Sequence, residues 1–226
     1  MSVKLATIII VLGLIVLGFV NKLFIIMHLY RRVEYTHKYR ENFIQFGNEI
    51  QKTGRLDNPQ YYELLRDVNK IQRELGLDGI ISYYRDPAAG IQMRDYPIML
   101  NFFNELRIYL NNRHLFSERI YLLISGCDEA MVKHIGSLTE AIELGKKRIV
   151  NPFFCFSNGI RWILGLPVRI LEWCGIISEH YSSVILDSKF SAVLGKIATI
   201  IGLIASIVTI IGGWNQVTLI IKSIVK

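Results

Sequence analysis

A charge-free apolar run near the amino terminus most restricts the folds open to this chain. Residues 5–20, LATIIIVLGLIVLGFV, contain no charged side chain, and the apolar pattern resumes two residues later and continues to Tyr30. At about 1.5 Å per residue, a helix over this stretch can cross a hydrocarbon core of roughly 30 Å. Because Arg31 and Arg32 close the run and no small-x-small cleavage site follows it, we expect an uncleaved transmembrane anchor over residues 1–30 rather than a secretory signal peptide.

The other end of the chain carries a second apolar stretch, in which small and hydroxyl residues recur at regular spacing. The steps alternate between four and three residues, so a helix places these residues on one face and leaves Ile, Leu and Val on the rest. The positions are Ser191, Gly195, Thr199, Gly202, Ser206, Thr209 and Gly213. We expect a carboxyl-terminal transmembrane helix within residues 191–226, with its crossing segment at about 197–214.

Two interpretations of this helix face stay open. Small residues let membrane helices approach closely, which predicts that the chain assembles with copies of itself into a homo-oligomer. Hydroxyl groups can also face water, which makes part of the face a candidate pore lining. The candidate pore-lining residues are Gly195, Thr199, Gly202, Ser206, Thr209 and Gly213.

The distribution of charge predicts the orientation in the lipid bilayer. Basic residues follow the first apolar run, among them Arg31, Arg32, Lys38 and Arg40, whereas Lys4 precedes it. The positive-inside rule then places the segment after the anchor in the cytoplasm, as expected for a multi-pass protein of the bacterial inner membrane. The net charge of +7 does not indicate nucleic-acid binding by the middle of the chain, where acidic and basic residues nearly balance.

Between the apolar ends, residues 31–150 are expected to form a cytoplasmic α-helical domain. Apolar and aromatic residues recur at four and three from Tyr35 to Ile50, which predicts a helix that continues from the anchor and ends at Gly54. Further helices are predicted from Pro59 to Gly76, from Pro97 to Asn112, over 117–125, and from a cap at Asp128 to Arg148. The periodicity breaks up between Asp78 and Pro97, where no strand alternation is seen and residues 86–90 are expected to form a loop. The predicted fold class is an all-α membrane protein with a cytoplasmic helical bundle.

Residues 151–190 are expected to lie at the membrane interface as an amphipathic or re-entrant helical segment. Arg161, Arg169 and Glu172 interrupt its apolar residues, and Pro167 is expected to break its helix in two. Basic side chains here and at the end of the preceding helix could surround the axis of an oligomer, where an anionic ligand would bind. The candidate ligand-binding residues are Lys146, Lys147, Arg148, Arg161 and Arg169, and the alternative is contact with lipid headgroups.

Few residues indicate catalysis. Arg107 and His114 resemble the Arg-x4-6-His motif of HEPN ribonucleases, which use both side chains on a phosphodiester, but Ile108 stands where that family usually has a polar residue. The alternative is a chance pair of surface side chains. His134 has no carboxylate or second histidine at metal-ligand spacing, so no metal site, cofactor or catalytic residue is expected. The three cysteines, Cys127, Cys155 and Cys174, follow no zinc or disulfide pattern and are expected to be reduced thiols.

The block NPFFCFSNGIRWILGLPVRILEWCGI, followed by the striped helix, resembles the tail of a group of uncharacterised small bacterial membrane proteins. The order of anchor, helical cytoplasmic domain and carboxyl-terminal membrane helix is also similar to that of membrane effectors of anti-phage defence, including the Hailong channel effector and a pore protein associated with a CRISPR nuclease. That similarity implies an oligomeric channel that depolarises an infected cell and responds to a nucleotide signal, such as a short single-stranded oligonucleotide.

The favoured function is therefore a homo-oligomeric membrane channel that is gated through its cytoplasmic domain by a nucleotide or oligonucleotide ligand. The alternatives are a membrane-anchored HEPN-like ribonuclease and a non-catalytic membrane tether or adaptor. Ion flux across a bilayer would separate the channel from both alternatives.

Overall fold

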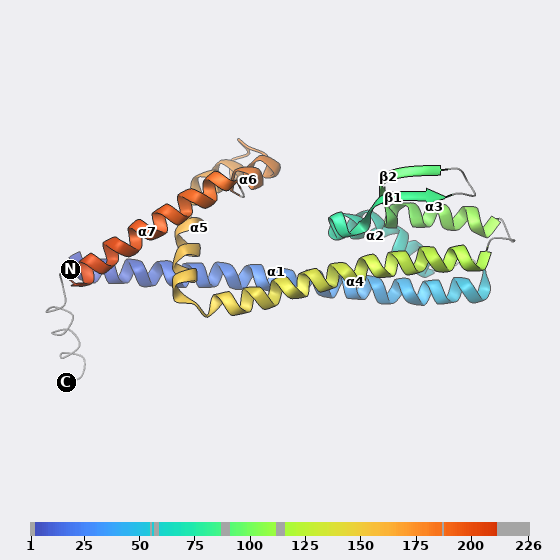
Figure 1. The fold of residues 1–226 in the computed structure, drawn as a ribbon, viewed down its shortest axis with the longest axis horizontal. Coiled ribbons are helices and arrows are strands. Elements are labelled where there is room, and N and C mark those ends of the chain that lie inside the picture. The colour runs from blue at the N-terminus through green and yellow to red at the C-terminus, as the bar shows by residue number, and fades with distance from the viewer. Residues whose placement is uncertain are drawn as a thin grey trace, which may run out of the picture. The chain divides into compact units, whose positions relative to one another are not determined.

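The chain is mostly helical, and its contacts divide it into two compact units (Figure 1). The structure, a computed structural model, describes residues 3–54, 56, 59–86, 91–111, 116–186 and 188–211. We call residues 28–143 the central unit, and residues 1–27 together with 144–226 the apolar unit. Helix α1 (Val3–Thr53) is one continuous helix that contributes to both units, as the apolar and aromatic periodicity predicted.

Three further helices build the central unit, and glycines end two of its helices where the sequence predicted. They are α2 (Pro59–Leu75), α3 (Ile98–Asn111) and most of α4 (Phe116–Ile149). Gly54, with φ 64°, follows α1, and Gly76, with φ 52°, follows α2. Glycine adopts this left-handed conformation without the steric penalty that a Cβ atom brings, so it ends a helix readily.

The core of the central unit lies between the second part of α1 and the other three helices. The aromatic face of α1 supplies Phe43 and Phe46, which are fully buried, and the ring of Phe43 meets the edge of Phe102 from α3 at 4.8 Å between centroids. The remaining buried residues of this core are Tyr39, Ile50, Tyr61, Leu64, Val68, Ile71, Leu75, Ile98, Met99, Phe103, Leu106, Ile120, Leu123, Cys127, Ala130 and Met131. Burial of this many large apolar side chains gives the unit its own hydrophobic core.

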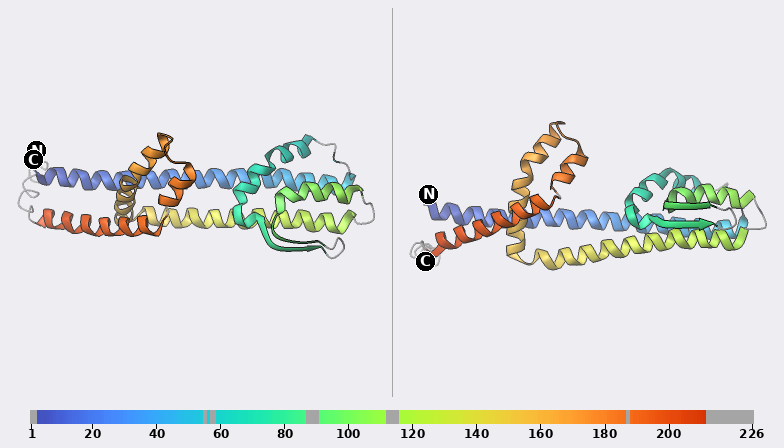
Figure 2. Two further views of the ribbon diagram at one scale, coloured as in Figure 1. Left: turned by 90° about the horizontal axis from the view of Figure 1, so that it is seen from above. Right: turned by 45° about the horizontal axis from the view of Figure 1, so that its top comes forward.

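A β-hairpin occupies the segment in which no strand was expected, so that expectation was wrong, and residues 87–90 of the predicted loop lie outside the described part of the chain. Strands β1 (Ile80–Asp86) and β2 (Ile91–Pro97) pair antiparallel, with Ile81 opposite Tyr96, and lie beside α3 (Figure 2). Tyr84 stacks on Tyr96 at 4.4 Å between ring centroids, whereas Tyr83 and Met93 are exposed. Because few positions of this short hairpin are buried, the apolar alternation that identifies a half-buried strand is weak in the sequence.

Gln72 fixes the base of the hairpin. Its side-chain amide donates from Nε2 to the carbonyl oxygen of Gly79 at 3.0 Å, and its Oε1 accepts from the backbone N–H of Met99 at 3.0 Å. Gly79 belongs to a short 3-10 helix (Gly76–Gly79) just before β1, and Met99 lies just after β2. One buried side chain on α2 therefore holds both ends of the hairpin, and it satisfies two backbone groups that burial would otherwise leave unpaired.

Helix α4 is a single helix, which corrects the prediction of two helices over 117–125 and from Asp128 onward. Gly126 lies within it, and a Cβ atom there would come within 3.1 Å of the Ile98 side chain. The glycine therefore permits close packing on α3 and does not end the helix. Asp128 caps no helix, since its carboxylate lies in the middle of α4 and pairs with Arg40 of α1.

In the part of the chain that the structure describes, the apolar unit contains the first part of α1, the end of α4, and three further helices. These are α5 (Pro152–Trp173), α6 (Glu179–Leu186) and α7 (Lys189–Ile211). Asn151 caps α5 by accepting hydrogen bonds from the backbone N–H groups of Phe153 and Phe154, and proline at the first position suits a helix start.

The predicted break at Pro167 is also wrong. Pro167 lies inside α5, which continues to Trp173, and the chain turns only at Gly175, with φ 71°. A proline removes one backbone hydrogen bond, and long apolar helices tolerate this loss.

Helix α1 contains a segment that is long and apolar enough to cross a membrane. By length and composition, it is the one such helix among the residues that the structure describes, and α7 has a shorter apolar stretch, Gly195–Ala205. The predicted second crossing at 197–214 overlaps α7 up to Ile211, and its last residues lie outside the described part of the chain.

Candidate functional site

Helices α1 and α5 cross at backbone contact in the apolar unit, because both have glycine at the crossing. A Cβ atom at Gly18 would stand 1.8 Å from the carbonyl oxygen of Cys155, and one at Gly159 would stand 2.1 Å from that of Leu14. Asn158 donates from Nδ2 to the carbonyl oxygen of Gly18 at 2.9 Å. Small residues and side-chain amides are the usual means by which apolar helices associate closely. Sequence reasoning missed this contact, since its two halves are about 140 residues apart.

Helix α7 packs on α5 through part of its small-residue face. The hydroxyl of Thr199 lies 3.1 Å from Ser157 Oγ and donates to the Gly195 carbonyl oxygen at 2.6 Å. The missing side chain of Gly195 leaves space for Arg161, because a Cβ atom there would be 2.7 Å from Arg161 Cγ. We call Ser157, Arg161, Gly195 and Thr199 the polar seam.

The other predicted pore-lining residues divide into two groups. Gly202 lies against α5, where a Cβ atom would be 3.5 Å from the ring of Phe156. Ser206 and Thr209 belong to α7, but their side chains are outside the described part of the structure, as is Gly213 entirely. The structure thus gives Gly195, Thr199 and Gly202 neighbours within the same chain, and pore lining stays a prediction for all six positions.

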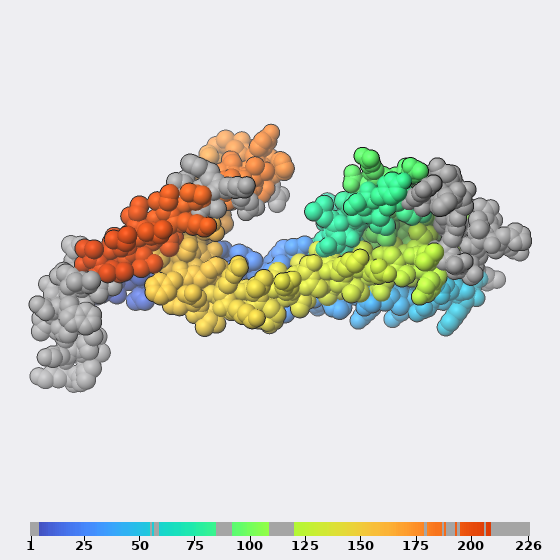
Figure 3. Space-filling view, viewed as in Figure 1, coloured from blue at the N-terminus to red at the C-terminus, as the bar shows by residue number. Residues whose placement is uncertain are grey.

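Several apolar side chains elsewhere on α7 are exposed, and α7 forms part of the molecular surface (Figure 3). They are Val193, Ile197, Ile200, Ile201, Ile204, Ile207 and Val208. An exposed apolar surface of this kind indicates contact with lipid or with another protein surface.

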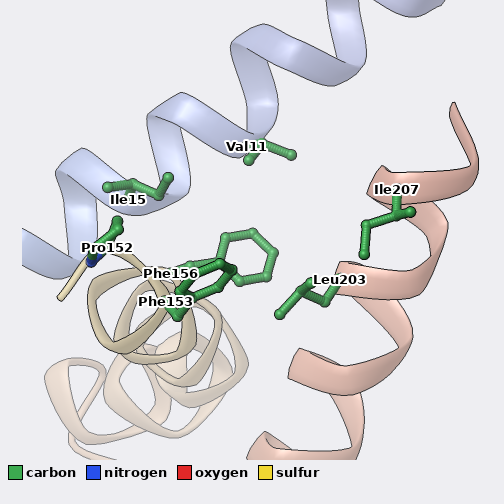
Figure 4. Close-up of a pocket in the computed structure, with 7 residues that line it drawn as sticks. All are labelled: Val11, Ile15, Pro152, Phe153, Phe156, Leu203 and Ile207. Carbon is green, nitrogen blue, oxygen red and sulfur yellow. The ribbon is translucent and has the colours of Figure 1, made fainter. Parts of the chain in front are cut away.

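An apolar groove lies between α1, α5 and α7. Its volume is about 260 Å³, and Figure 4 shows Phe153 and Phe156 of α5 between Val11 of α1 and Leu203 of α7. Its other lining residues are Ile15, Pro152 and Ile207. No lining side chain carries a polar group, so the groove suits a hydrocarbon ligand and offers no group for catalysis.

The five basic residues predicted to bind a ligand have separate local neighbours. Lys146, Lys147 and Arg148 end α4, where cations interact favourably with the helix dipole. Arg161 lies over Gly195, and the Arg169 guanidinium is 5.5 Å from the centre of the Trp162 ring. Arg148 and Lys22 of α1 both contact the Phe154 ring. Lys22 was not among the residues that the sequence predicted to bind a ligand.

Arg107, one half of the resemblance to HEPN ribonucleases, has a partner in the central unit. Its Nε and Nη2 atoms donate to the hydroxyl oxygen of Tyr61 at 2.9 and 2.7 Å. His114 lies outside the described residues. The contact with Tyr61 links α3 to α2, which is a structural role.

His134 is the centre of a charged cluster that the sequence did not reveal. Its Nδ1 lies 3.0 Å from Asp78 Oδ2, its Nε2 lies 3.1 Å from Glu74 Oε1, and Arg32 donates to the same Glu74 oxygen at 2.7 Å. Its two carboxylate partners are 56 and 60 residues away in sequence, so the residues next to His134 in the chain could not indicate them. Among the described residues, no group of His, Cys, Asp and Glu is arranged to hold a metal ion.

Comparisons with protein-family models, with curated proteins and with solved structures found no match to this chain.

Proposed function

We propose that the chain is an integral protein of the bacterial inner membrane whose copies assemble into an ion channel, with the central unit in the cytoplasm. The apolar segment of α1 supports membrane insertion, since it is long and apolar enough to cross a bilayer. The exposed Ile and Val side chains of α7 support the same proposal, because they would contact lipid in a membrane and water elsewhere.

The polar seam is the observation that carries the channel proposal. Hydroxyl and ionisable side chains are unfavourable inside a membrane, and where they occur they commonly line paths for ions or water. Ser157 and Thr199 hydrogen-bond to each other, and Arg161 lies beside them over Gly195. The proposed path is therefore lined by α5 and α7 together, whereas the sequence alone suggested α7.

The channel proposal requires an oligomer, because only two helices of each chain form the polar seam. One pair of helices cannot enclose a water-filled path, so several copies would have to place their seams around a common axis. A ring of Arg161 side chains around that axis would favour anions over cations, because side-chain charge near a constriction sets the sign of the permeant ion.

The proposed physiological role is dissipation of the membrane potential. In an anti-phage effector, opening would arrest the infected cell, and a nucleotide or single-stranded oligonucleotide would be the trigger. The predicted ligand residues, Lys146, Lys147, Arg148, Arg161 and Arg169, supply positive charge for such a ligand.

Ion flux in liposomes tests this proposal. The purified full chain should release trapped chloride faster than trapped potassium, and Arg161→Gln should reduce the chloride preference. Lys196→Gln removes one exposed cation from α7 outside the seam and is the matched control, with flux expected to equal that of the wild type. Reconstituted protein that gives no flux, with or without oligonucleotide, would contradict the channel and leave the membrane tether as the better proposal.

A further inference from the structure

Two cations from different helices share one aromatic ring in the apolar unit. The Lys22 ammonium of α1 is 5.9 Å from the centre of the Phe154 ring, and the Arg148 guanidinium of α4 is 6.0 Å from it. Among the described residues, no carboxylate lies within ion-pair distance of either cation. The ring offers a favourable cation–π contact, but it does not neutralise two positive charges.

The location of this pair indicates what neutralises it. Lys22 comes just after the charge-free run of α1, and residues 5–21 of a helix measure about 26 Å, close to the thickness of a hydrocarbon core. Repulsion between two like charges grows as the surroundings become less polar. A pair of cations at the end of a membrane-crossing segment would therefore attract an anion strongly, and phospholipid phosphates are concentrated at that level.

The surroundings of the pair are apolar and exposed. Val150 and Phe153 are 81% and 64% exposed, and they lie on either side of the cap of α5. Phe153, the chain neighbour of Phe154, also lines the apolar groove between α1, α5 and α7 (Figure 4). The first turn of α5 therefore contributes Phe154 to the charged pair and Phe153 to the apolar groove.

We propose that Lys22 and Arg148 bind the phosphate of an anionic phospholipid and that one acyl chain of the same lipid occupies the groove. The guanidinium and the ammonium would donate charge-assisted hydrogen bonds to the phosphate oxygens. The groove supplies only apolar contacts, as an acyl chain requires. This inference rests on the membrane insertion proposed above, but it does not depend on channel activity.

Lipid retention in native mass spectrometry tests the site. The full chain is reconstituted in an equimolar mixture of phosphatidylglycerol and phosphatidylcholine, extracted in a mild detergent, and examined for bound lipid. The wild type should retain more phosphatidylglycerol than phosphatidylcholine. In K22Q/R148Q, the ratio of retained phosphatidylglycerol to retained phosphatidylcholine should fall at least tenfold. The control K52Q/K196Q removes the same charge from two exposed lysines and should retain the wild-type preference.

A second variant tests the groove, and a competitor tests the source of the phosphate. Leu203→Trp should lower retention of both lipids severalfold, because the larger side chain fills the groove. Glycerol phosphate at millimolar concentration should not displace the lipid, and displacement would show that a free phosphate ester is the ligand and overturn the proposal. An unchanged preference in K22Q/R148Q, or an equal loss in K52Q/K196Q, would overturn it as well.

Membrane integration is measured on the same preparations by resistance to alkaline carbonate extraction. Loss of lipid preference in a protein that stays integrated and helical by circular dichroism supports the site. K22R/R148K keeps both charges and should restore phosphatidylglycerol retention, which a loss of folding would not allow. Wild-type protein released by carbonate would instead contradict the proposed membrane function itself.

Discussion

Arg40 and Asp128 form a two-point ion pair that joins α1 to α4 across 88 residues of sequence. The Nε atom of Arg40 donates to Asp128 Oδ1 at 2.5 Å, and Nη2 donates to Oδ2 at 3.1 Å. This hydrogen bond and the adjacent carboxylate raise the pKa of the Arg40 guanidinium above its usual value. Each side chain is 28% exposed, so solvent screens the pair only in part.

Replacing Asp128 by Asn should therefore destabilise the central unit by about 1 kcal/mol, the upper range for a partly exposed ion pair with good geometry. Thermal unfolding of the full chain in detergent, followed by circular dichroism, measures this change. Glu129→Gln is the matched control, because its contact with Lys133 is 4.0 Å long and both side chains are mostly exposed. An equal loss of stability in both variants would show that charge on α4, rather than the Arg40 contact, is responsible.

The His134 cluster predicts a larger effect. The ring nitrogens of His134 lie 3.0 Å from the Asp78 carboxylate and 3.1 Å from the Glu74 carboxylate, and His134 is 5% exposed. His134→Leu removes both contacts and should destabilise the central unit by about 2 kcal/mol, less than for a fully buried pair because Arg32 still contacts Glu74. The measurement is the same unfolding transition.

An exposed histidine gives the control for this substitution. His37→Leu changes the same residue type on α1, where the side chain is exposed, and should leave the transition unchanged. A double variant, His134→Leu with Glu74→Leu, should recover part of the lost stability, since it also removes one carboxylate that has lost a donor. A double variant as unstable as the sum of the single ones would contradict coupling between these residues.

Helix ends and the aromatic face of α1 could be predicted because their causes are local in sequence. Gly54 and Gly76 end helices through their own backbone freedom, and the spacing of Phe43 and Phe46 alone places them on one buried face. Asp128 was misassigned for the opposite reason. An acidic residue two positions after a glycine resembles a helix start, and its actual partner Arg40 lies too far away in sequence to be recognised from local spacing.

The small and hydroxyl residues of α7 could be predicted from the sequence, but their neighbours on α5 could not. Spacing identified Gly195 and Thr199 as members of one helix face, yet nothing in their neighbourhood indicated that Arg161 and Ser157 would lie against them. Lys22 lies within residues 1–30, which were predicted only as a membrane anchor. Its pairing with a cation on another helix depends on how α1, α4 and α5 pack, which periodicity within one helix does not report.

Cys127 should be chemically inert in the folded protein. The residue is fully buried in the core of the central unit, and burial raises the pKa of its thiol well above the usual value, with Glu105 and Asp128 adding to the shift. Because the thiolate is the reactive form, maleimide labelling of the Cys155→Ser, Cys174→Ser variant should stay negligible from pH 7 to pH 9 and become rapid in denaturant. A variant that keeps only the exposed Cys174 should label readily without denaturant. Labelling of native Cys127 at a comparable rate would show that this core opens.

The glycine contact between α1 and α5 predicts an asymmetric response to methyl groups. Gly18→Ala places a Cβ atom where the carbonyl oxygen of Cys155 would be 1.8 Å away, so the helices must separate, and the Asn158 hydrogen bond to Gly18 must lengthen. Overpacking of this kind costs about 1–3 kcal/mol, and a backbone neighbour that cannot rotate away places the expected loss at the upper end. Gly13→Ala, five residues earlier in α1, meets nothing within 4 Å and should be neutral or slightly stabilising, because alanine favours a helix more than glycine does. Thermal unfolding of both variants in the same detergent measures the difference, and equal transitions would contradict the close crossing of α1 and α5.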